Sequence, residues 1–402
     1  MEEAGYERGS GGYRRVLIAL FCAGIATFAQ LYSVQGVLPL AQADLGITPA
    51  QSALAVSAAT LGLALAVVPW SAISDRFGRR QTMIVAIVAA TVFALASIFA
   101  PSFGLLVGIR FFEGAALGGI PAVAMAYLSE EVHRRHATLA AATYISGTGI
   151  GGLSGRLVAA PVGEWFGWRM GVLAVTIMAV LATVVFIIIC PRQRHFAAQP
   201  IKMGDVARRI LGTLNDRHLL VLYAEAFLLM GTFVAMYNYL GFHLGGEPFN
   251  LSPTWVSLLF LAYLFGSWAS SAAGKLAARL GRRRVLTAAT TVMLGGAALT
   301  LVAWLPVIIV GLVLFTVGFF ASHAIANGWV PAIARRSPAQ ASSFYTLAYY
   351  TGSSMVGYAS GIVLAHGGWG GFIATLCALE AVGIAMALLV LPAGDRGNAS
   401  GA

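Results

Sequence analysis

The sequence predicts an all-α membrane protein in which twelve transmembrane helices form two pseudo-symmetric six-helix bundles. Of its 402 residues, 59% are hydrophobic and only 10% are charged, whereas soluble proteins average about 25% charged residues. The apolar residues occur in runs long enough to cross a bilayer, and one charged segment between two such runs occurs twice. We therefore expect lipid to cover most of the surface.

Twelve apolar runs have the length of a spanning helix, which needs about 20 mostly apolar residues. They lie at 16–39, 51–73, 82–100, 104–128, 138–160, 170–191, 219–243, 255–275, 285–304, 307–333, 340–364 and 372–392. The first run is longer than the apolar core of a signal peptide, which has about 7–15 residues, so we expect it to stay in the protein as a membrane helix. Thr48 and Ser252 each precede a proline, as a helix N-cap residue often does.

The positions of lysine and arginine predict the orientation, because short cytoplasmic loops carry an excess of both. If the N-terminus is inside, nearly all of the 25 Lys and Arg residues lie in cytoplasmic segments, and only Arg169 lies in an external loop. The sequence therefore predicts a multi-pass protein of the cell's inner or plasma membrane with both termini in the cytoplasm.

Internal repetition predicts two parallel halves. The segment from Ser71 to Arg80 returns 203 residues later as the segment from Gly274 to Arg283, with Ala278 in the place of Asp75. Two further pairs recur at offsets of 204 and 201, namely Thr48-Pro49 with Ser252-Pro253 and Gly167-Trp168 with Gly368-Trp369. Landmarks in the same order at nearly one spacing are typical of repeated membrane bundles.

The repeat places an N-terminal bundle at 14–191, a cytoplasmic linker at 192–218 and a C-terminal bundle at 219–393. In the linker, Met203, Val206 and Ile210 recur at helical spacing, with Arg208 and Arg209 between them. This pattern favours a short basic amphipathic helix on the inner leaflet, and a solvated linker is the alternative.

The repeated segment resembles the most specific motif of the major facilitator superfamily, usually written G-x-L-x-D-R-x-G-R-R. Ser71 and Ile73 stand where that motif has glycine and leucine. The second copy keeps Gly274, Leu276, Arg279 and Gly281 but lacks the aspartate. The resemblance extends over essentially the whole chain, from about residue 14 to 393.

Further strings are similar to those of bacterial 12-span drug:proton antiporters of the YnfM type. The segment from Arg110 to Gly114 resembles the superfamily's helix-4 arginine motif. The segment from Gly147 to Gly155 resembles the antiporters' glycine-rich motif, with Gly152 in place of its proline. Those glycines also suit close helix packing. The strings Tyr127–Glu131 and Tyr144–Gly147 resemble the YnfM-type branch of drug or metabolite exporters.

This resemblance implies a proton-coupled secondary active transporter that exports amphiphilic or cationic drugs or metabolites by alternating access. The expected partners are a small-molecule substrate and the lipid bilayer, with no nucleic acid. The proton is the coupling ion, no cofactor or metal is expected, and a monomer is the expected state.

Charged residues inside spans are candidates for proton coupling, because each costs about 2.5–3.5 kcal/mol on insertion scales. Arg110 and Glu113 share a helix face, either as a static pair or as a proton carrier with its tuning arginine. Glu225 has no charged neighbour at helical spacing in its span, and an acid near the inner interface is the alternative. Arg156 could pair with Glu113 or attract an anionic substrate. His323 could titrate during the cycle or be a packing histidine.

The superfamily's cavity-lining helices supply candidate substrate contacts here. They are Tyr32, Gln35, Tyr144, Asn238, Tyr239, Asn327, Tyr345 and Tyr349. Each aromatic residue taken alone is as readily explained by packing. Together they indicate a pocket with aromatic faces, which suits apolar or cationic molecules.

The repeated charged segment is a candidate conformational latch between the halves. Asp75 could accept hydrogen bonds from a helix N-terminus or from arginines of the other half. The residues assigned to this latch are Asp75, Arg76, Gly78, Arg79, Arg80, Arg279, Gly281 and Arg282. The positive-inside rule alone would also explain the arginines.

Other function classes fit less well. A sugar or small organic-acid transporter of the same superfamily is the main alternative, because Arg110 and Arg156 could bind a carboxylate. A non-transporting receptor or scaffold would need a larger extramembrane domain. An enzyme is not expected, because no phosphate-binding loop or nucleophile motif occurs. The three cysteines, Cys22, Cys190 and Cys377, lie in apolar segments without metal-type spacing.

Overall fold

The computed structural model describes residues 5–194, 196, 212, 214–334 and 337–393. Across these residues the chain is helical apart from short connections, and one isolated β-bridge joins Tyr6 to Val132. The amphipathic helix predicted within the linker falls mostly on residues 197–211 and 213, outside the described part of the chain.

Nine helical segments among the described residues are long and apolar enough to cross a membrane. One of them, Gln340–Val390, bends at Gly368 and contains two predicted spans. The helices α7 (Arg134–Phe166) and α13 (Arg282–Leu299) match the two remaining predictions, 138–160 and 285–304. Helical segments therefore lie at all twelve predicted spans, although the first span is not one continuous helix.

The contacts divide the chain into two compact units, one comprising Met1–Ile47 with Leu54–Met203 and the other Thr48–Ala53 with Gly204–Ala402. The bundle boundaries predicted from the repeat, 14–191 and 219–393, stay predictions.

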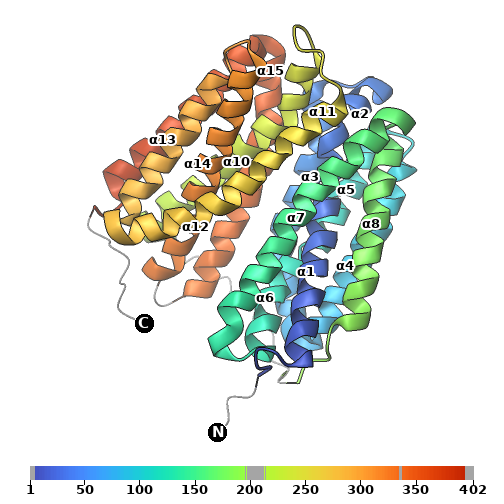
Figure 1. Cartoon of the computed structure of the whole chain (residues 1–402), viewed down its shortest axis with the longest axis vertical. Helices are drawn as coiled ribbons and strands as arrows, with labels where there is room; N and C mark the ends of the chain where they lie inside the picture. Colours follow the sequence, from blue (N-terminus) through green and yellow to red (C-terminus); the bar gives the residue numbers. More distant parts are fainter. Residues whose placement is uncertain (1–4, 195, 197–211, 213, 335–336, 394–402) are drawn as a thin grey trace. The chain divides into compact units, whose positions relative to one another are not determined.

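The first unit begins with α1 (Gly11–Leu31), η1 (Gln35–Val37) and α2 (Leu38–Leu45). It continues with α3 (Pro49–Phe77), which starts within the small segment assigned to the second unit, then α4 (Arg79–Ile98), α5 (Phe103–Leu117), α6 (Gly119–Glu131), α7 and α8 (Trp168–Ile189). Figure 1 shows α1 lying alongside α7 and α8. The first span, predicted as one helix over 16–39, is broken after Leu31, which corrects that prediction.

Glycines bring α7 close to α1. A Cβ added at Gly151 would lie 2.6 Å from the carbonyl oxygen of Ile25, and one added at Gly155 would lie 2.7 Å from that of Ala29. Real Cβ atoms essentially never come this close to backbone. These glycines of the antiporter-like motif are therefore required for packing, which is the role that small residues have between membrane helices.

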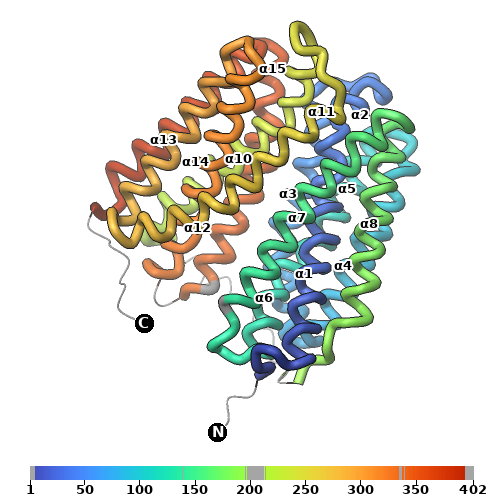
Figure 2. The backbone as a smooth tube through the Cα atoms, viewed as in Figure 1, coloured from blue at the N-terminus to red at the C-terminus, as the bar shows by residue number. Residues whose placement is uncertain are grey.

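The second unit contains α10 (Arg217–Gly245), α11 (Pro253–Leu258), η2 (Leu259–Leu261), α12 (Ala262–Leu280), α13, α14 (Leu305–Ile333) and α15 (Pro338–Val390). Helix α10 packs mainly on α15, and α14 lies between α12 and α13 (Figure 2). The dihedral angles of Gly368, φ 58° and ψ −166°, divide α15 into its two spans.

The repeated turns have one backbone geometry. Gly78 has φ 97° and ψ 149°, and Gly281, 203 residues later, has φ 93° and ψ 146°. Residues with a side chain rarely adopt such positive φ angles. The N-cap prediction holds for Thr48, because α3 begins directly after it and its Oγ1 accepts a hydrogen bond from Gln51 N–H. Ser252 is the N-cap residue of α11, but its side chain makes no capping hydrogen bond. The sequence repeat is thus also a structural repeat.

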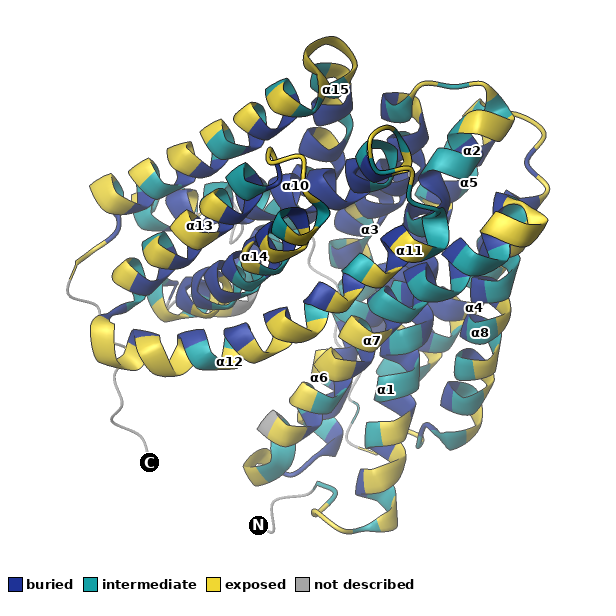
Figure 3. Ribbon diagram, turned by 45° about the horizontal axis from the view of Figure 1, so that its top comes forward, coloured by how far each residue is buried: buried dark blue, intermediate teal, exposed yellow. Residues whose placement is uncertain are grey.

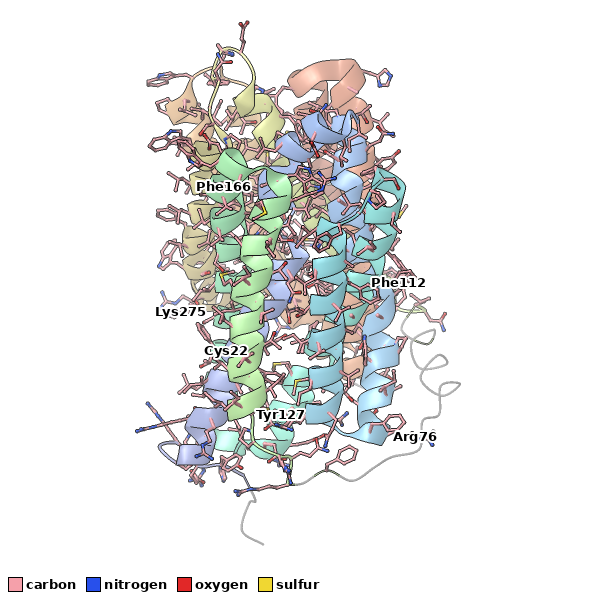
Figure 4. The ribbon with its side chains drawn as sticks, turned by 90° about the vertical axis from the view of Figure 1, so that its right-hand side faces the viewer. Cys22, Arg76, Phe112, Tyr127, Phe166 and Lys275 are labelled. Carbon is pink, nitrogen blue, oxygen red and sulfur yellow. The ribbon has the colours of Figure 1, made fainter. Side chains whose placement is uncertain are left out.

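The surfaces of both units suit a lipid environment. Helix α8 is the most apolar candidate span, yet only 33% of its apolar window is buried. Large apolar side chains such as Leu181 and Ile188 are 63% and 76% exposed. In Figure 3, exposed positions run along most of α12, and in Figure 4 the side chains of Phe112 and Lys275 point away from the ribbon. An apolar exterior of this extent is typical of membrane helices.

Candidate functional site

The repeated basic turn of the first unit is held by a charge cluster. Arg79 Nε and Nη2 donate to Glu130 Oε1 at 3.0 and 2.8 Å, and Nη1 donates to Ser74 Oγ at 2.6 Å and to Asp75. Arg79 therefore joins the end of α3 to the end of α6. Glu130 was not among the predicted site residues, although it lies in the Tyr127–Glu131 string on the basic side of the chain.

The next arginine of the motif caps a helix of its own unit. Arg80 donates from Nε to the carbonyl of Cys190 and from Nη2 to that of Ile187, both at 2.9 Å. These carbonyls belong to the end of α8, where the helix leaves its last C=O groups without partners. Arg80 thus supplies the missing donors and also complements the negative end of the helix dipole.

Arg283 repeats this arrangement in the second unit. Its Nη1 donates to the carbonyls of Leu388 and Leu391, at 3.2 and 3.0 Å, at the end of α15. Each half therefore uses the arginine at the same motif position to cap its own last helix. Arg283 was not assigned a role from the sequence.

The other latch residues have more local surroundings. Gly78 and Gly281 form the two turns, and Arg76 lies over the ring of Phe77 with its Cζ 5.4 Å from the centroid. Arg279 is exposed near the end of α12. A latch that joins the two halves through Asp75, Arg76, Arg279 and Arg282 stays a prediction.

The pair predicted in the fourth span is fully buried. Nη1 of Arg110 lies 2.7 Å from Oε2 of Glu113, and both side chains have an exposed fraction of 0%. Arg110 also donates to the carbonyls of Gln30 at 3.2 Å, Leu31 at 2.6 Å and Ala55 at 3.1 Å. Because α1 ends at Leu31, Arg110 ties α5 to an open helix end and to α3. These contacts favour the static pair among the alternatives for Arg110 and Glu113.

Arg156 lies with two predicted cavity residues. Its Nε donates to Gln35 Oε1 at 2.7 Å, and its Cζ lies 4.2 Å from the centroid of the Tyr32 ring. The break between α1 and α2 supplies both partners, so this irregular backbone positions polar groups inside the first unit. The carboxylate of Glu113 is paired with Arg110 rather than with Arg156. Tyr144 packs in the core of this unit, about three turns along α7 from Arg156.

In the second unit, three of the predicted residues meet, and a fourth, Glu225, is buried in the same unit. His323 Nδ1 lies 3.0 Å from the hydroxyl oxygen of Tyr345, and the His323 ring lies 4.7 Å from that of Tyr349. Glu225 is 1% exposed, and neither of its carboxyl oxygens has a hydrogen-bond partner among the described residues. Contacts among the described residues thus join His323 on α14 to Tyr345 and Tyr349 on α15.

Glycine makes room for the Glu225 carboxyl group. A Cβ added at Gly383, in the second span of α15, would lie 3.2 Å from Oε2 of Glu225. Gly383 was not predicted, because only the fold shows which residue faces Glu225. Glu380, one helical turn away, is also 1% exposed.

The remaining predicted cavity residues, Tyr239, Asn238 and Asn327, differ from one another in burial and contacts. The hydroxyl of Tyr239 donates to the carbonyl of Gly357 at 2.8 Å, which indicates a packing role between α10 and α15. Asn238 is 1% exposed, whereas Asn327 is exposed on α14. Among the described residues, no group of three His, Cys, Asp or Glu side chains is placed to hold a metal ion.

Comparisons with known proteins agree on one family. The family model described as "Major Facilitator Superfamily" matches residues 16–357. The inner membrane transport protein YnfM of Escherichia coli is 39% identical over 96% of this chain and 91% of its own length. An uncharacterized MFS-type transporter of Bacillus subtilis, YybF, is 36% identical over 91% of this chain and 89% of its own length.

A solved structure shows the same fold. It is that of a bacterial homolog of the human lysosomal transporter Spinster, in an inward-facing and unoccupied conformation. The TM-score is 0.74 at 16% sequence identity, and the match covers 94% of each chain.

Proposed function

Because the chain belongs to the major facilitator superfamily, we propose that it is a proton-coupled transporter that exports amphiphilic or cationic drugs or metabolites by alternating access. That it is a multi-pass membrane transporter, and not an enzyme, follows from the family and from its named relatives. The coupling ion, the direction and the substrate class are the proposal. It includes a monomer in the inner membrane with both termini in the cytoplasm.

The observation that carries the proposal is the buried Glu225 with its neighbours. A carboxylate in this position would lose its hydration and gain no hydrogen bond from the described residues, which costs several kcal/mol. Proton loss is therefore expected only in a conformation in which water or substrate reaches the group. This is what a coupling site requires, because proton and substrate must favour different states or exclude one another.

Tyr345 and His323 extend the site. The Tyr345 hydroxyl contacts His323 and can donate to one neighbour while it accepts from another, so we propose that it passes a proton between His323 and Glu225 in a conformation that brings the hydroxyl to the carboxyl group. The membrane potential then supplies about 2.3 kcal/mol per charge per 100 mV. Glu113 is the second candidate acid, but its ion pair with Arg110 gives it a structural role already.

Transport by the purified protein in liposomes tests the proposal. We expect a pH gradient to drive export of a cationic dye, Glu225→Gln to abolish that dependence, and Tyr345→Phe to slow it. Glu380→Gln is the matched control, since it neutralises another buried acid of the same unit. Dye export that is unchanged when the gradient is collapsed, or in a Glu113→Gln/Glu225→Gln double variant, would contradict proton coupling.

A transporter of small organic acids is the second candidate function. The buried Arg156, held by Gln35 and Tyr32, is a preformed cation that could bind a carboxylate. Competition binding with cationic dyes and small organic acids separates the two. If only acids compete, and Arg156→Gln removes that competition, the anion transporter is correct and the cation exporter is not.

A further inference from the structure

The second unit has an apolar groove where α12, α13 and α14 meet. Its volume is about 280 Å³. Small residues form its floor, among them Ala273, Ala289 and Gly318, and larger ones form its rim. Both α12 and α13 pack against α14 and touch one another much less, which leaves the groove between them. The rim residues Trp268, Leu276, Leu280 and Val292 are 40–69% exposed, so the groove is open.

One charged residue stands at the basic end of this groove. Arg284 lines it in the first turn of α13, beside Leu280 at the end of α12. From there the lining continues to Val292 on α13 and back to Trp268 on α12. At 1.5 Å per residue these stretches measure about 12 and 18 Å. One leaflet of the hydrocarbon core is about 15 Å thick, so the groove has the length of an acyl chain within one leaflet.

The stretch of sequence around Arg284 contains basic residues but no acidic ones. No Asp or Glu occurs between Glu247 and Glu380, whereas Lys275, Arg279 and the run Arg282–Arg284 lie within that stretch. In the first unit, by contrast, Asp75 and Glu130 neutralise Arg79. The position that corresponds to Asp75 is Ala278. Arg284 itself is exposed and pairs with no carboxylate among the described residues, so it is available to bind an anion from outside these helices.

From this groove and its charge we propose that the second unit binds an anionic phospholipid, with the phosphate at Arg284 and one acyl chain along α12 and α13. Basic pockets between membrane helices on the cytoplasmic side suit anionic headgroups. The start of α13 adds to the attraction, since Gly281 is its N-cap and no side chain caps it, and a helix N-terminus favours phosphate. The site is independent of the transported substrate.

Native mass spectrometry of the purified full-length protein tests this site. The probes are phosphatidylglycerol and phosphatidylcholine with identical acyl chains. We expect the wild-type protein to retain phosphatidylglycerol more strongly. Arg284→Gln should weaken its retention about fivefold, the contribution of one basic residue near a lipid surface, and should leave phosphatidylcholine unchanged. Arg284→Lys should retain most of the preference, which shows that the variants fold.

A second pair of variants tests the acyl-chain part. Ala288→Phe fills the groove from an exposed position and should weaken retention of both lipids. The matched controls are Ala278→Phe, exposed on α12 outside the lining, and Arg14→Gln, an exposed arginine of the first unit. Both should bind as the wild type does. Equal retention of the two lipids, or an Arg284→Gln variant that still prefers phosphatidylglycerol, would overturn the proposal.

Discussion

Replacing Arg110 by alanine gives the sharpest prediction about the first unit. The side chain donates hydrogen bonds to three backbone carbonyls and pairs with Glu113, and it is fully buried. Hydrogen bonds between membrane helices contribute about 0.6 kcal/mol on average and at most about 1.7. Three of them amount to about 2–5 kcal/mol. Leaving one partner of a buried ion pair alone costs about 3–5 kcal/mol, and the two effects overlap. We therefore expect Arg110→Ala to lower the free energy of unfolding by at least about 3 kcal/mol.

Glu113→Gln should lower the free energy of unfolding less than Arg110→Ala does, because the guanidinium loses its counter-anion but keeps its three carbonyl partners. An Arg110→Met/Glu113→Gln double variant should be more stable than Arg110→Ala, since no unpaired carboxylate is left. The free energy of unfolding would be measured by denaturation with sodium dodecyl sulfate in mixed micelles. Arg169→Ala is the control, because that arginine lies in the first turn of α8, 35% exposed, and its partner Asp44 is 50% exposed. The static-pair interpretation fails if Glu113→Gln is as destabilising as Arg110→Ala, or if the double variant recovers nothing.

Three further predictions concern the repeated turns. Arg80→Ala and Arg283→Ala should each lose about 1–2 kcal/mol of unfolding free energy, by similar amounts, because both remove a cation from a helix C-terminus; unequal losses in thermal melting would contradict the repeat of this role. Gly78→Ala should cost about 1–2 kcal/mol from its positive φ angle, and a melting temperature equal to that of the wild type would show that the turn adapts. Glu130→Gln should lower the free energy of unfolding by up to about 1 kcal/mol. The loss should be larger than that of Asp75→Asn, since Glu130 accepts two hydrogen bonds from Arg79 and is less exposed than Asp75. If Asp75→Asn lowers the melting temperature more than Glu130→Gln does in a thermal-shift assay, the charge cluster is contradicted.

The spans and their repetition could be predicted because both follow from local patterns. Membrane helices are fixed by runs of apolar residues, and the turns at Gly78 and Gly281 need glycine for their backbone angles. The break after Leu31 could not be predicted, because apolar residues continue through it. Its polar neighbours, such as Gln35, acquire partners only when α7 packs beside them.

The partners of the charged residues were harder to predict. Arg79 contacts an acid 51 positions away, and Arg80 contacts carbonyls 107 and 110 positions away. Every residue has a backbone carbonyl, so the sequence does not show which carbonyls at a helix end lack a donor. The fold is needed to identify them. Two features of the sequence hint at these roles. Arginine occurs at the equivalent positions of both turns, and Glu130 is an acidic residue on the side of the chain that is predicted to be basic.

The arginines of this chain therefore do three different things that a count of positive charges does not separate. Arg79 is neutralised by carboxylates, whereas Arg80, Arg283 and Arg110 supply donors to helix ends or backbone carbonyls. Arg284 belongs to a stretch that contains no acid at all. The second copy of the motif kept the glycine turn and the capping arginine, which each half needs for its own fold, and lacks the aspartate. The turn at Gly281 has the backbone angles of the turn at Gly78 although it lacks this acid, so the turn geometry itself does not depend on the aspartate, and we expect the exposed Arg284 to bind an anionic headgroup of the membrane.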